Sequence, residues 1–192
     1  MIGYFSEDEL LSLGFASLGK NVQISKTSTL YNRGNIHLGD NVRIDNFCVL
    51  APSSSAIFRI GNNVQISAYS FINGMGNVSL QDFVTLAPYV RIFSSTDDYS
   101  GRTMTGATLN AEYLGTESGP VWVDSHVIIG NGSTIMPSVH VGKGAAIGAY
   151  SFVNADVSSF MIVAGVPARN IKERRRDLLE LEKRYLDAKF KG

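Results

Sequence analysis

Cysteine is nearly absent from this sequence, and so is any excess of charge. The single cysteine, Cys48, excludes a disulfide within the chain. The 17 basic residues are matched by 17 acidic ones, and a chain without net charge has no field to attract nucleic acid or an anionic membrane surface. No apolar run approaches the roughly 18 residues of a membrane span, and no signal-peptide core is present. We therefore expect a cytoplasmic protein with no nucleic-acid or membrane partner.

A repeat of six residues runs through most of the chain. From Leu38 the sequence reads LGDNVR and IDNFCV, from Ile60 IGNNVQ and ISAYSF, and from Leu80 LQDFVT and LAPYVR. It resumes at Val123 with VDSHVI, IGNGST, IMPSVH, VGKGAA, IGAYSF and VNADVS. The first place is Ile, Leu or Val, and the fifth is small or β-branched, so we expect Cys48 at a fifth place to be a buried packing residue. Helices repeat their apolar residues every three or four positions and lone sheets every two. A period of six therefore predicts short strands and tight corners stacked into a β-solenoid.

The remaining segments divide the chain around this repeat. In residues 1–20, Ser6 precedes three acidic residues, which is typical of a helix N-terminus, and we expect a short helical cap over the open end of the solenoid. Residues 21–168 form the predicted solenoid, interrupted at 93–120 by an excursion that breaks the period. Such long excursions are usually functional. Residues 169–192 mix basic residues with apolar ones at near-helical spacing, which predicts an amphipathic C-terminal helix.

Four stretches of the sequence resemble a known family. The hexads followed by AGVPARNI (164–171) resemble the hexapeptide-repeat acyltransferases, in the branch of the maltose and galactoside acetyltransferases. FSEDELLSLGF (5–15), DNVRIDNFCVL (40–50) and SSTDDYSG (94–101) are more similar still to enzymes that acylate nucleotide-linked amino-deoxy sugars for bacterial surface polysaccharides such as O-antigen or capsule. The resemblance implies an all-β, left-handed parallel β-helix, a homotrimer, and acetyl-CoA as acyl donor.

The donor site follows from the same resemblance. Family members hold the extended pantetheine arm of CoA along a lane of small residues, which let the ligand approach the backbone. This chain offers small residues in that region at Gly130, Gly132, Gly142, Gly144, Ala145, Ala146, Gly148 and Ala149, although the corners of any such solenoid favour glycine and alanine. The resemblance places Gly130, Asn131, Ala149 and Asn154 on the pantetheine arm and Arg169 and Lys172 on the nucleotide phosphates. Arginine and lysine suit phosphate oxygens.

The catalytic position departs from the sugar O-acetyltransferases. In those relatives a histidine in the loop after the APxV corner removes the proton of a sugar hydroxyl. After Ala87-Pro88-Tyr89-Val90 that place is taken here by Asp97, with Asp98 beside it. A hydroxyl needs a base such as histidine, with a pKa near 6.5, whereas a neutral amine is already a nucleophile and needs mainly orientation. The change therefore favours an amino-sugar acceptor, with Asp97 orienting the amine and Asp98 as a second candidate catalytic residue. The two aspartates also fit an ordinary turn.

Three alternatives stay open at this stage. His126, at an outward fourth place near a subunit boundary, is a candidate base for an O-acetyltransferase acting on a saccharide hydroxyl. A zinc enzyme resembling the γ-carbonic anhydrases needs three histidines at one boundary, which the positions of His37 and His140 disfavour, so we expect no metal. A non-catalytic solenoid is the third alternative. For the acceptor we expect contacts from Asn73, Tyr99 and Arg102.

Overall fold

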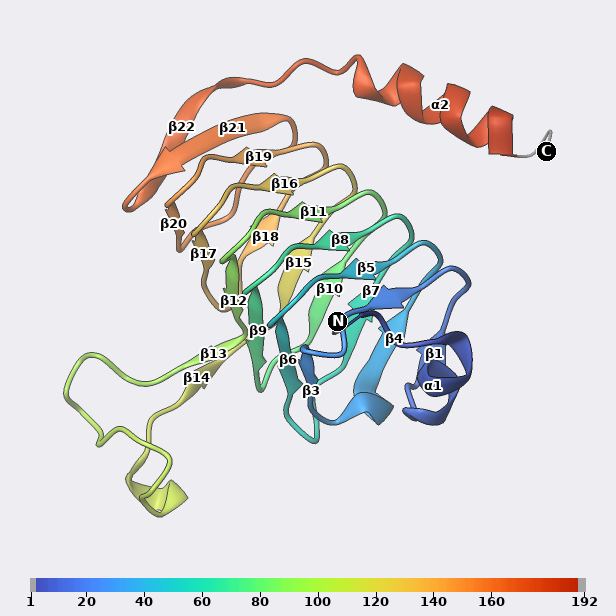
Figure 1. The fold of residues 1–192 in the computed structure, drawn as a ribbon. Helices are drawn as coiled ribbons and strands as arrows, with labels where there is room; N and C mark the ends of the chain where they lie inside the picture. The colour runs from blue at the N-terminus through green and yellow to red at the C-terminus, as the bar shows by residue number, and fades with distance from the viewer. Residues whose placement is uncertain (1–2, 190–192) are drawn as a thin grey trace.

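The chain folds into a three-sided parallel β-helix (Figure 1). The computed structural model describes residues 3–189. Each turn of the coil places one strand on each of three flat sheets, which we call faces 1, 2 and 3, and the coil makes about seven turns. The predicted fold class, a left-handed parallel β-helix with a short N-terminal and a C-terminal helix, is confirmed.

The strands of each face follow one another in spatial order. Face 1 contains β1 (Ser17–Leu18), β4 (Ile36–Leu38), β7 (Phe58–Ile60), β10 (Val78–Leu80), β15 (Val121–Val123) and β18 (His140–Val141). Face 2 contains β2 (Gln23–Ile24), β5 (Arg43–Ile44), β8 (Gln65–Ile66), β11 (Thr85–Leu86), β16 (Ile128–Ile129), β19 (Ala146–Ile147), β21 (Met161–Gly165) and β22 (Ala168–Glu173). Face 3 contains β3 (Thr29–Leu30), β6 (Val49–Pro52), β9 (Phe71–Gly74), β12 (Arg91–Phe93), β17 (Thr134–Ile135) and β20 (Phe152–Val153).

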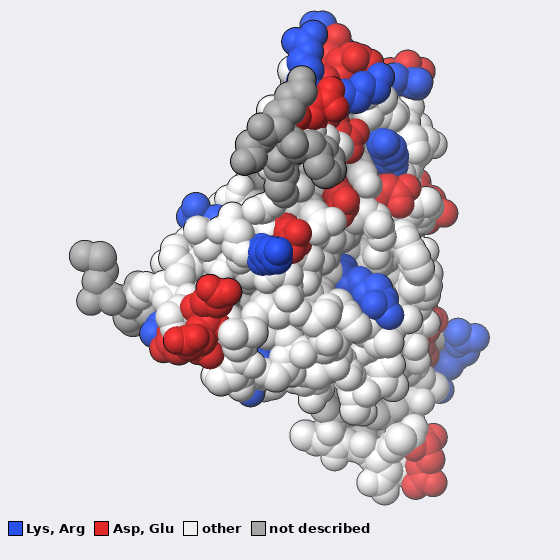
Figure 2. All heavy atoms as spheres, turned by 90° about the vertical axis from the view of Figure 1, so that its right-hand side faces the viewer, with Lys and Arg blue, Asp and Glu red and all other residues white. Residues whose placement is uncertain are grey.

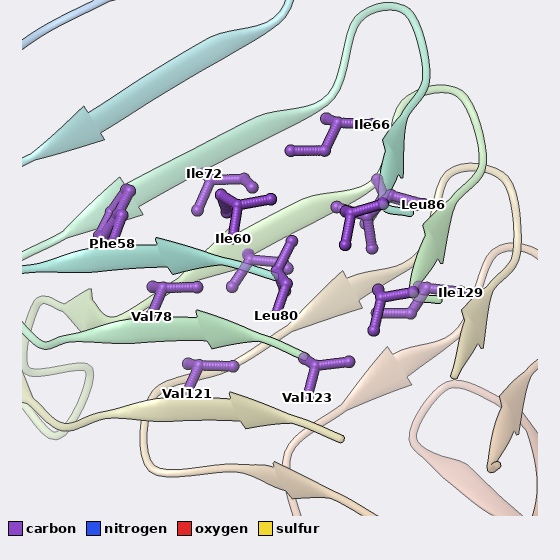
Figure 3. Close-up of a cluster of buried hydrophobic side chains, with 14 of the residues drawn as sticks. Phe58, Ile60, Ile66, Ile72, Val78, Leu80, Leu86, Val121, Val123 and Ile129 are labelled. Atoms are coloured by element: carbon purple, nitrogen blue, oxygen red, sulfur yellow. The ribbon is translucent and has the colours of Figure 1, made fainter. Parts of the chain in front are cut away.

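The core is a set of aliphatic columns inside the coil. Leu80, for example, lies in register beside Ile60 on one side and Val123 on the other. Figure 3 shows such side chains pointing inward from the three faces and stacking on their equivalents in the next coil. The first and fifth places of the quoted hexads are buried, including Cys48. The period of six therefore predicted the core correctly, because each hexad supplies one strand and one corner.

Residues at the fourth place of the hexads turn the chain at the corners. In every quoted hexad except VNADVS their φ angles are positive, as at Asn63 (56°), Phe83 (62°) and Tyr89 (63°), in a region that residues other than glycine and asparagine seldom adopt. Phe47, Tyr69 and Tyr89 occupy this place at three successive corners between faces 2 and 3. Their rings stack with centroids 5.1 and 4.8 Å apart, and each side chain is about half exposed. We call these three residues the aromatic column.

The third place of the hexads links the coils at the corner between faces 1 and 2. The backbone N–H of Asp40 donates to Asn62 Oδ1 at 2.8 Å, and the N–H of Asn62 donates in turn to Asp82 Oδ1 at 2.7 Å. Each side chain thus satisfies a backbone donor that the strands leave unpaired. This ladder explains why Asp and Asn recur at the third place.

The N-terminal cap is present as predicted. Helix α1 (Glu7–Ser12) begins with a capping box in which Ser6 and Glu9 bond each other's backbone. Leu10 of this helix is buried in the core cluster, and Phe5 and Leu13 pack against that cluster. The coil itself starts earlier than expected, because β1 (Ser17–Leu18) already pairs with β4.

The C-terminal segment differs from the prediction of a helix over residues 169–192. Residues 168–173 form β22, which turns back through Gly165 and pairs antiparallel with β21. The reason is that the last coil leaves the edge of β21 open, and a returning strand satisfies that edge. The helix, α2, spans Leu178–Lys189, and residues 190–192 lie outside the described residues. Figure 2 shows both signs of charge mixed along its upper rim, where Figure 1 places α2.

Neither helix of the described part of the chain has the length and apolar character needed to cross a bilayer.

Candidate active site

The excursion at 93–120 leaves the coil at the corner between faces 3 and 1 as a projecting arm (Figure 1). Its two legs pair as the antiparallel strands β13 (Ser95–Thr96) and β14 (Glu117–Ser118), and its far end carries a short 3₁₀ turn, η2 (Ala111–Tyr113). The buried hydroxyl of Ser94 donates to the backbone oxygen of Gly76 at 2.7 Å. The base of the arm is therefore fixed to the preceding coil.

A cavity of about 710 Å³ lies between this arm and face 3. Asn73 enters it from β9, while Asp97 and Tyr99 enter it from the arm. These three predicted site residues come from segments more than twenty positions apart, and the fold brings them together. The other lining residues are Phe93, Ser95, Thr96, Thr116, Thr134, Met136 and Phe152.

The two adjacent aspartates have different surroundings. Asp97 is exposed and lines the cavity. Asp98 is only 8% exposed, and its carboxylate accepts the N–H of Ser100 at 2.7 Å and the hydroxyl of Thr103 at 3.1 Å. Hydrogen bonds from Ser100, then from Thr103, lower the pKa of Asp98 to about 2. Asp98, predicted as a candidate catalytic residue, therefore forms a turn and does not line the cavity, whereas Asp97 is exposed to a substrate there.

Arg102 does not line the cavity. It is exposed on the arm, where its Nε donates to Ser100 Oγ at 3.0 Å. Within a single chain it therefore lies beyond the group formed by Asn73, Asp97 and Tyr99.

His126 is placed at a different corner, between faces 1 and 2. Its ring stacks on Phe83 with centroids 4.9 Å apart, and its Nε2 lies 3.0 Å from Glu182 Oε2 of α2, in an orientation that forms no hydrogen bond. The side chain is 10% exposed. His126 was predicted to point outward; it does so, but α2 covers it, and it does not join the cavity that contains Asp97.

The other two histidines lie on face 1. His140 Nε2 is 3.0 Å from Asp124 Oδ2, and His37 Nδ1 is 3.1 Å from Ser17 Oγ. In the part of the chain that the structure describes, no three His, Cys, Asp or Glu side chains are grouped as metal ligands.

Small residues form a continuous column at the corner between faces 2 and 3. A Cβ added to Gly130 would lie 2.6 Å from the backbone nitrogen of Ala149, and one added to Gly148 would lie 2.7 Å from the Cβ of Ala164. Asn131 lies beside Gly130 at the same corner. The strands that follow these corners, β17 and β20, supply Thr134 and Phe152 to the cavity. Of the predicted donor lane, Gly130, Gly132, Gly148 and Ala149 thus lie at the corner that adjoins the cavity, whereas Gly142 and Gly144 lie at the corner between faces 1 and 2 and do not belong to this column.

The predicted phosphate-binding residues lie next to this column on β22. Arg169 pairs with Ala164 of β21 and Lys172 pairs with Ile162, and both side chains are exposed. Two cations at the end of a lane of small residues suit a ligand with a slender arm and terminal phosphates. The residues present therefore fit CoA.

Asn154 lies on the other side of the arm. It lines a second cavity of about 360 Å³ together with Glu117 and Ser118, and this cavity shares Thr96, Met136 and Phe152 with the first one. Asn154 is therefore nearer to the arm than to the column of small residues.

Sequence reasoning missed four cavity residues on or directly beside face 3. Phe93 ends β12, Thr134 and Phe152 stand at the sixth place of their hexads, and Met136 stands at the second. Both places point outward from the coil. A large apolar residue at an outward place was the available signal, because on a solvated face it has no packing role.

Comparisons with known proteins agree with this geometry. No family model matches the chain. The dTDP-4-amino-4,6-dideoxy-D-glucose acyltransferase of Escherichia coli is 42% identical over 181 residues, which are 94% of each chain. Among solved structures, AntD, an N-acyltransferase from Bacillus cereus in complex with dTDP and 3-hydroxybutyryl-CoA, is 39% identical with a TM-score of 0.93 over 98% of both chains. The hexapeptide-repeat acetyltransferase VCA0836 of Vibrio cholerae is 19% identical, with a TM-score of 0.64 over 90% of this chain and 80% of that one, and shows the fold alone.

The coil, the arm and the column of small residues, together with the relatives at 42% and 39% identity, define an acyltransferase built on a parallel β-helix. Within that class, the chain belongs to the family of the dTDP-4-amino-4,6-dideoxyglucose acyltransferases. The resemblance noted in the sequence is thereby confirmed.

Proposed function

We propose that this protein transfers an acetyl group from acetyl-CoA to the amino group of a dTDP-linked amino-deoxy sugar. The observation that carries the proposal is Asp97, an exposed carboxylate in the cavity where O-acetyltransferases need a histidine. The relatives support the nucleotide and the amine, since a variant of AntD was solved with dTDP-4-amino-4,6-dideoxyglucose and coenzyme A. The role in surface polysaccharide synthesis and the cytoplasmic location remain predictions.

The chemical step is amide formation. The amine lone pair attacks the thioester carbonyl carbon, the C–N bond forms, and the C–S bond breaks with its electron pair leaving on sulfur. The nitrogen, positively charged after attack, then loses a proton that ends on the thiolate. Asp97 holds the amine in line with the carbonyl and accepts or relays this proton. No strong base is needed, because the proton leaves a nitrogen that attack has already made acidic.

The remaining roles follow from position. Asn73 and Tyr99 line the cavity with Asp97 and contact the acceptor. Gly130, Asn131 and Ala149 border the pantetheine arm, Asn154 lies near its reactive end, and Arg169 and Lys172 bind the phosphates of CoA. Arg102 lies at the outer part of the projecting protein arm (residues 93–120), and its positive charge can attract the dTDP diphosphate.

The active unit that we propose is a homotrimer. The half-exposed aromatic column (Phe47, Tyr69 and Tyr89) and the projecting arm leave apolar surface that a second copy would cover. Light scattering coupled to size exclusion gives the mass directly, and a monomer at micromolar concentration would contradict this part of the proposal.

The test compares two acceptors. Purified protein is incubated with acetyl-CoA and either dTDP-4-amino-4,6-dideoxyglucose or its 4-hydroxy counterpart, and thiol release is followed. We expect turnover with the amine alone. Equal turnover of the hydroxy sugar would favour the O-acetyltransferase alternative, and no turnover of either, with no thermal shift by acetyl-CoA, would favour a non-catalytic solenoid.

Asp97→Asn tests the residue that carries the proposal. We expect kcat to fall about 100-fold with the melting temperature unchanged, because proton transfer and orientation contribute that much and Asp97 is exposed. Glu112→Gln, an exposed acid at the far end of the same arm, is the matched control and is expected to keep wild-type turnover. Wild-type turnover by Asp97→Asn removes Asp97 from the mechanism.

A further inference from the structure

We propose that Asp98 is the positioning residue of this active site, which holds Asp97 and Tyr99 in the cavity without touching the substrate. The inference rests on the proposed function for its kinetic part and on the arm itself for its structural part. It assigns the neighbouring aspartates to separate tasks, one chemical and one structural.

Asp98 faces the opposite side of the chain from Asp97 and Tyr99. In an extended chain successive side chains point to opposite sides. Asp97 and Tyr99 both line the cavity, and Tyr99 is 90% exposed. Asp98 stands between them, is 8% exposed, and does not line the cavity. Its carboxylate therefore points into the arm, away from the place where a substrate would be.

Both carboxylate oxygens of Asp98 accept hydrogen bonds from within the arm. Oδ1 accepts the backbone N–H of Ser100 at 2.7 Å, and Oδ2 accepts the hydroxyl of Thr103 at 3.1 Å. Both oxygens are thus engaged within the outgoing leg of the arm. Charge-assisted bonds of this kind are stronger than bonds between neutral groups, so Asp98 fixes the chain from 98 to 103 as one turn.

Thr103 connects this turn to the returning leg of the arm, because it packs against Gly115. A Cβ on Gly115 would collide with the side chain of Thr103, so the two residues are closely packed. One residue further out, the N–H of Met104 donates to the backbone oxygen of Tyr113 at 2.9 Å. Asp98, Thr103 and Gly115 therefore form a cross-tie between the two legs, just beyond the cavity wall made by Asp97 and Thr116.

The consequence for catalysis is geometric. Asp97 follows the two-residue strand β13 directly, and the arm extends from the coil. Without the cross-tie, the two legs would be joined near Asp97 by β13–β14 pairing, and further out by the bond from Met104 to Tyr113. A displacement of about 1 Å at a reacting group costs up to about 100-fold in rate. Asp98 thus acts on the rate through Asp97.

Four variants test this assignment. Asp98→Ala removes both bonds, and we expect kcat to fall about 10- to 100-fold with little change in the KM for acetyl-CoA. Asp98→Asn keeps an oxygen for the Ser100 N–H and an amide that can pair with the Thr103 hydroxyl, so it is expected to retain activity within about threefold. Thr103→Val removes the hydroxyl that donates to Asp98. In the double variant with Asp98→Ala, Thr103→Val should lower kcat by less than it does alone, since both changes remove the same hydrogen bond. Thr105→Val, exposed two residues beyond Thr103 on the same leg and outside the tie, is the control and should leave kcat unchanged.

Hydrogen exchange provides a readout that needs no substrate. Asp98→Ala is expected to raise exchange at the amides of Ser100 and Met104, with the core amides unchanged, whereas Asp97→Asn leaves both sets unchanged.

If Asp98→Asn is as inactive as Asp97→Asn while exchange stays at the wild-type rate, Asp98 acts chemically and the proposal is overturned. Wild-type kcat and exchange in Asp98→Ala overturn it as well. If the wild-type protein turns over no amino sugar, the proposed function fails, while the exchange result still decides whether Asp98 orders the arm.

Discussion

His126 Nε2 lies 3.0 Å from Glu182 Oε2, so that a corner of the coil meets the C-terminal helix α2. The ring of Phe83 stacks on His126 with an angle of 2° between the two ring planes. Tyr185 of the same helix donates its hydroxyl to Asn63 Oδ1 at 3.1 Å. Arg174, upstream of the helix, donates to the backbone oxygens of His126 and Gly144 at 2.9 Å. The histidine that hydroxyl acetylation would need is thus engaged in fixing a helix.

We expect His126→Asn to loosen α2 and to leave acetyl transfer within about threefold of wild type. Asparagine tolerates the φ of 64° at this corner, so the substitution removes the ring without adding backbone strain. Loss of the stack and of the contact to Glu182 should cost about 1–2 kcal/mol. Thermal unfolding and hydrogen exchange at the α2 amides measure the first effect, and thiol release measures the second.

The control for His126 is Lys183→Ala on the same helix. Lys183 is exposed and pairs with Glu180 on the helix surface, so exchange at α2 should change little. A loss of activity in His126→Asn comparable to that of Asp97→Asn would contradict the assignment and make His126 the base.

The repeat determined how much of the fold could be predicted. Leu38, Ile44 and Val42 stand at places that are inward in every coil, because one hexad gives one strand and one corner. Residues 168–173 could not be predicted in this way. Their strand exists to pair with the edge of β21, and that edge appears only when the last coil is in place. The mixture of basic and apolar residues there has the spacing of either a helix or an exposed strand.

The candidate site was predictable where residue type alone indicates chemistry. Asp97 was found because a carboxylate replaced a histidine at a defined distance from Ala87-Pro88-Tyr89-Val90. The separate tasks of Asp97 and Asp98 were not visible, since they depend on which side of the arm each faces. Met136 and Phe152 were missed for a related reason: the outward places of face 3 become cavity walls only because the arm lies over them.

Ala149→Leu is expected to raise the KM for acetyl-CoA about tenfold or more at an unchanged melting temperature. Ala149 is exposed at the corner beside Gly130, so a larger side chain fills the donor lane and not the core. Blocking the approach of the pantetheine arm to the backbone should cost about 1–3 kcal/mol of binding free energy. Initial rates over a range of acetyl-CoA concentrations give the value.

Ala68→Leu is the matched control for Ala149. Ala68 holds the same third place in the hexad ISAYSF that Ala149 holds in IGAYSF, three coils nearer the N-terminus on the same corner. Its KM for acetyl-CoA should equal that of the wild type. Equal KM values for both variants and the wild type would show that the donor does not use this corner.

Arg169→Ala is expected to lower kcat/KM for acetyl-CoA about tenfold and to leave the reaction with acetyl-pantetheine unchanged. The guanidinium is exposed on β22, and among residues 3–189 it bonds only the backbone oxygen of Ala168, at 2.9 Å. It is therefore available to a phosphate, and such a contact is worth about 1.5–3 kcal/mol. Arg175→Ala is the control, because Arg175 is paired with Asp177 at the surface. An equal loss with acetyl-pantetheine would place Arg169 outside phosphate binding.

Asp82→Ala is expected to lower the free energy of unfolding by about 1–3 kcal/mol, because it leaves the backbone N–H of Asn62 without its acceptor at a half-buried corner. For a chain of this length each kcal/mol corresponds to a fall of about 2–4 °C in melting temperature. Asp82→Asn keeps an acceptor oxygen and should melt within about 1–2 °C of the wild type. Gln81→Ala, at the neighbouring position of the same corner, removes a bond to Ser79 and serves as the control.

If Asp82→Asn melts as low as Asp82→Ala, the charge of Asp82 matters more than its bond to Asn62. The ladder would then owe its stability to electrostatics at the corner. If neither variant shifts the transition, the third place of the hexads contributes nothing to coil stacking, and the recurrence of Asp and Asn there requires another cause.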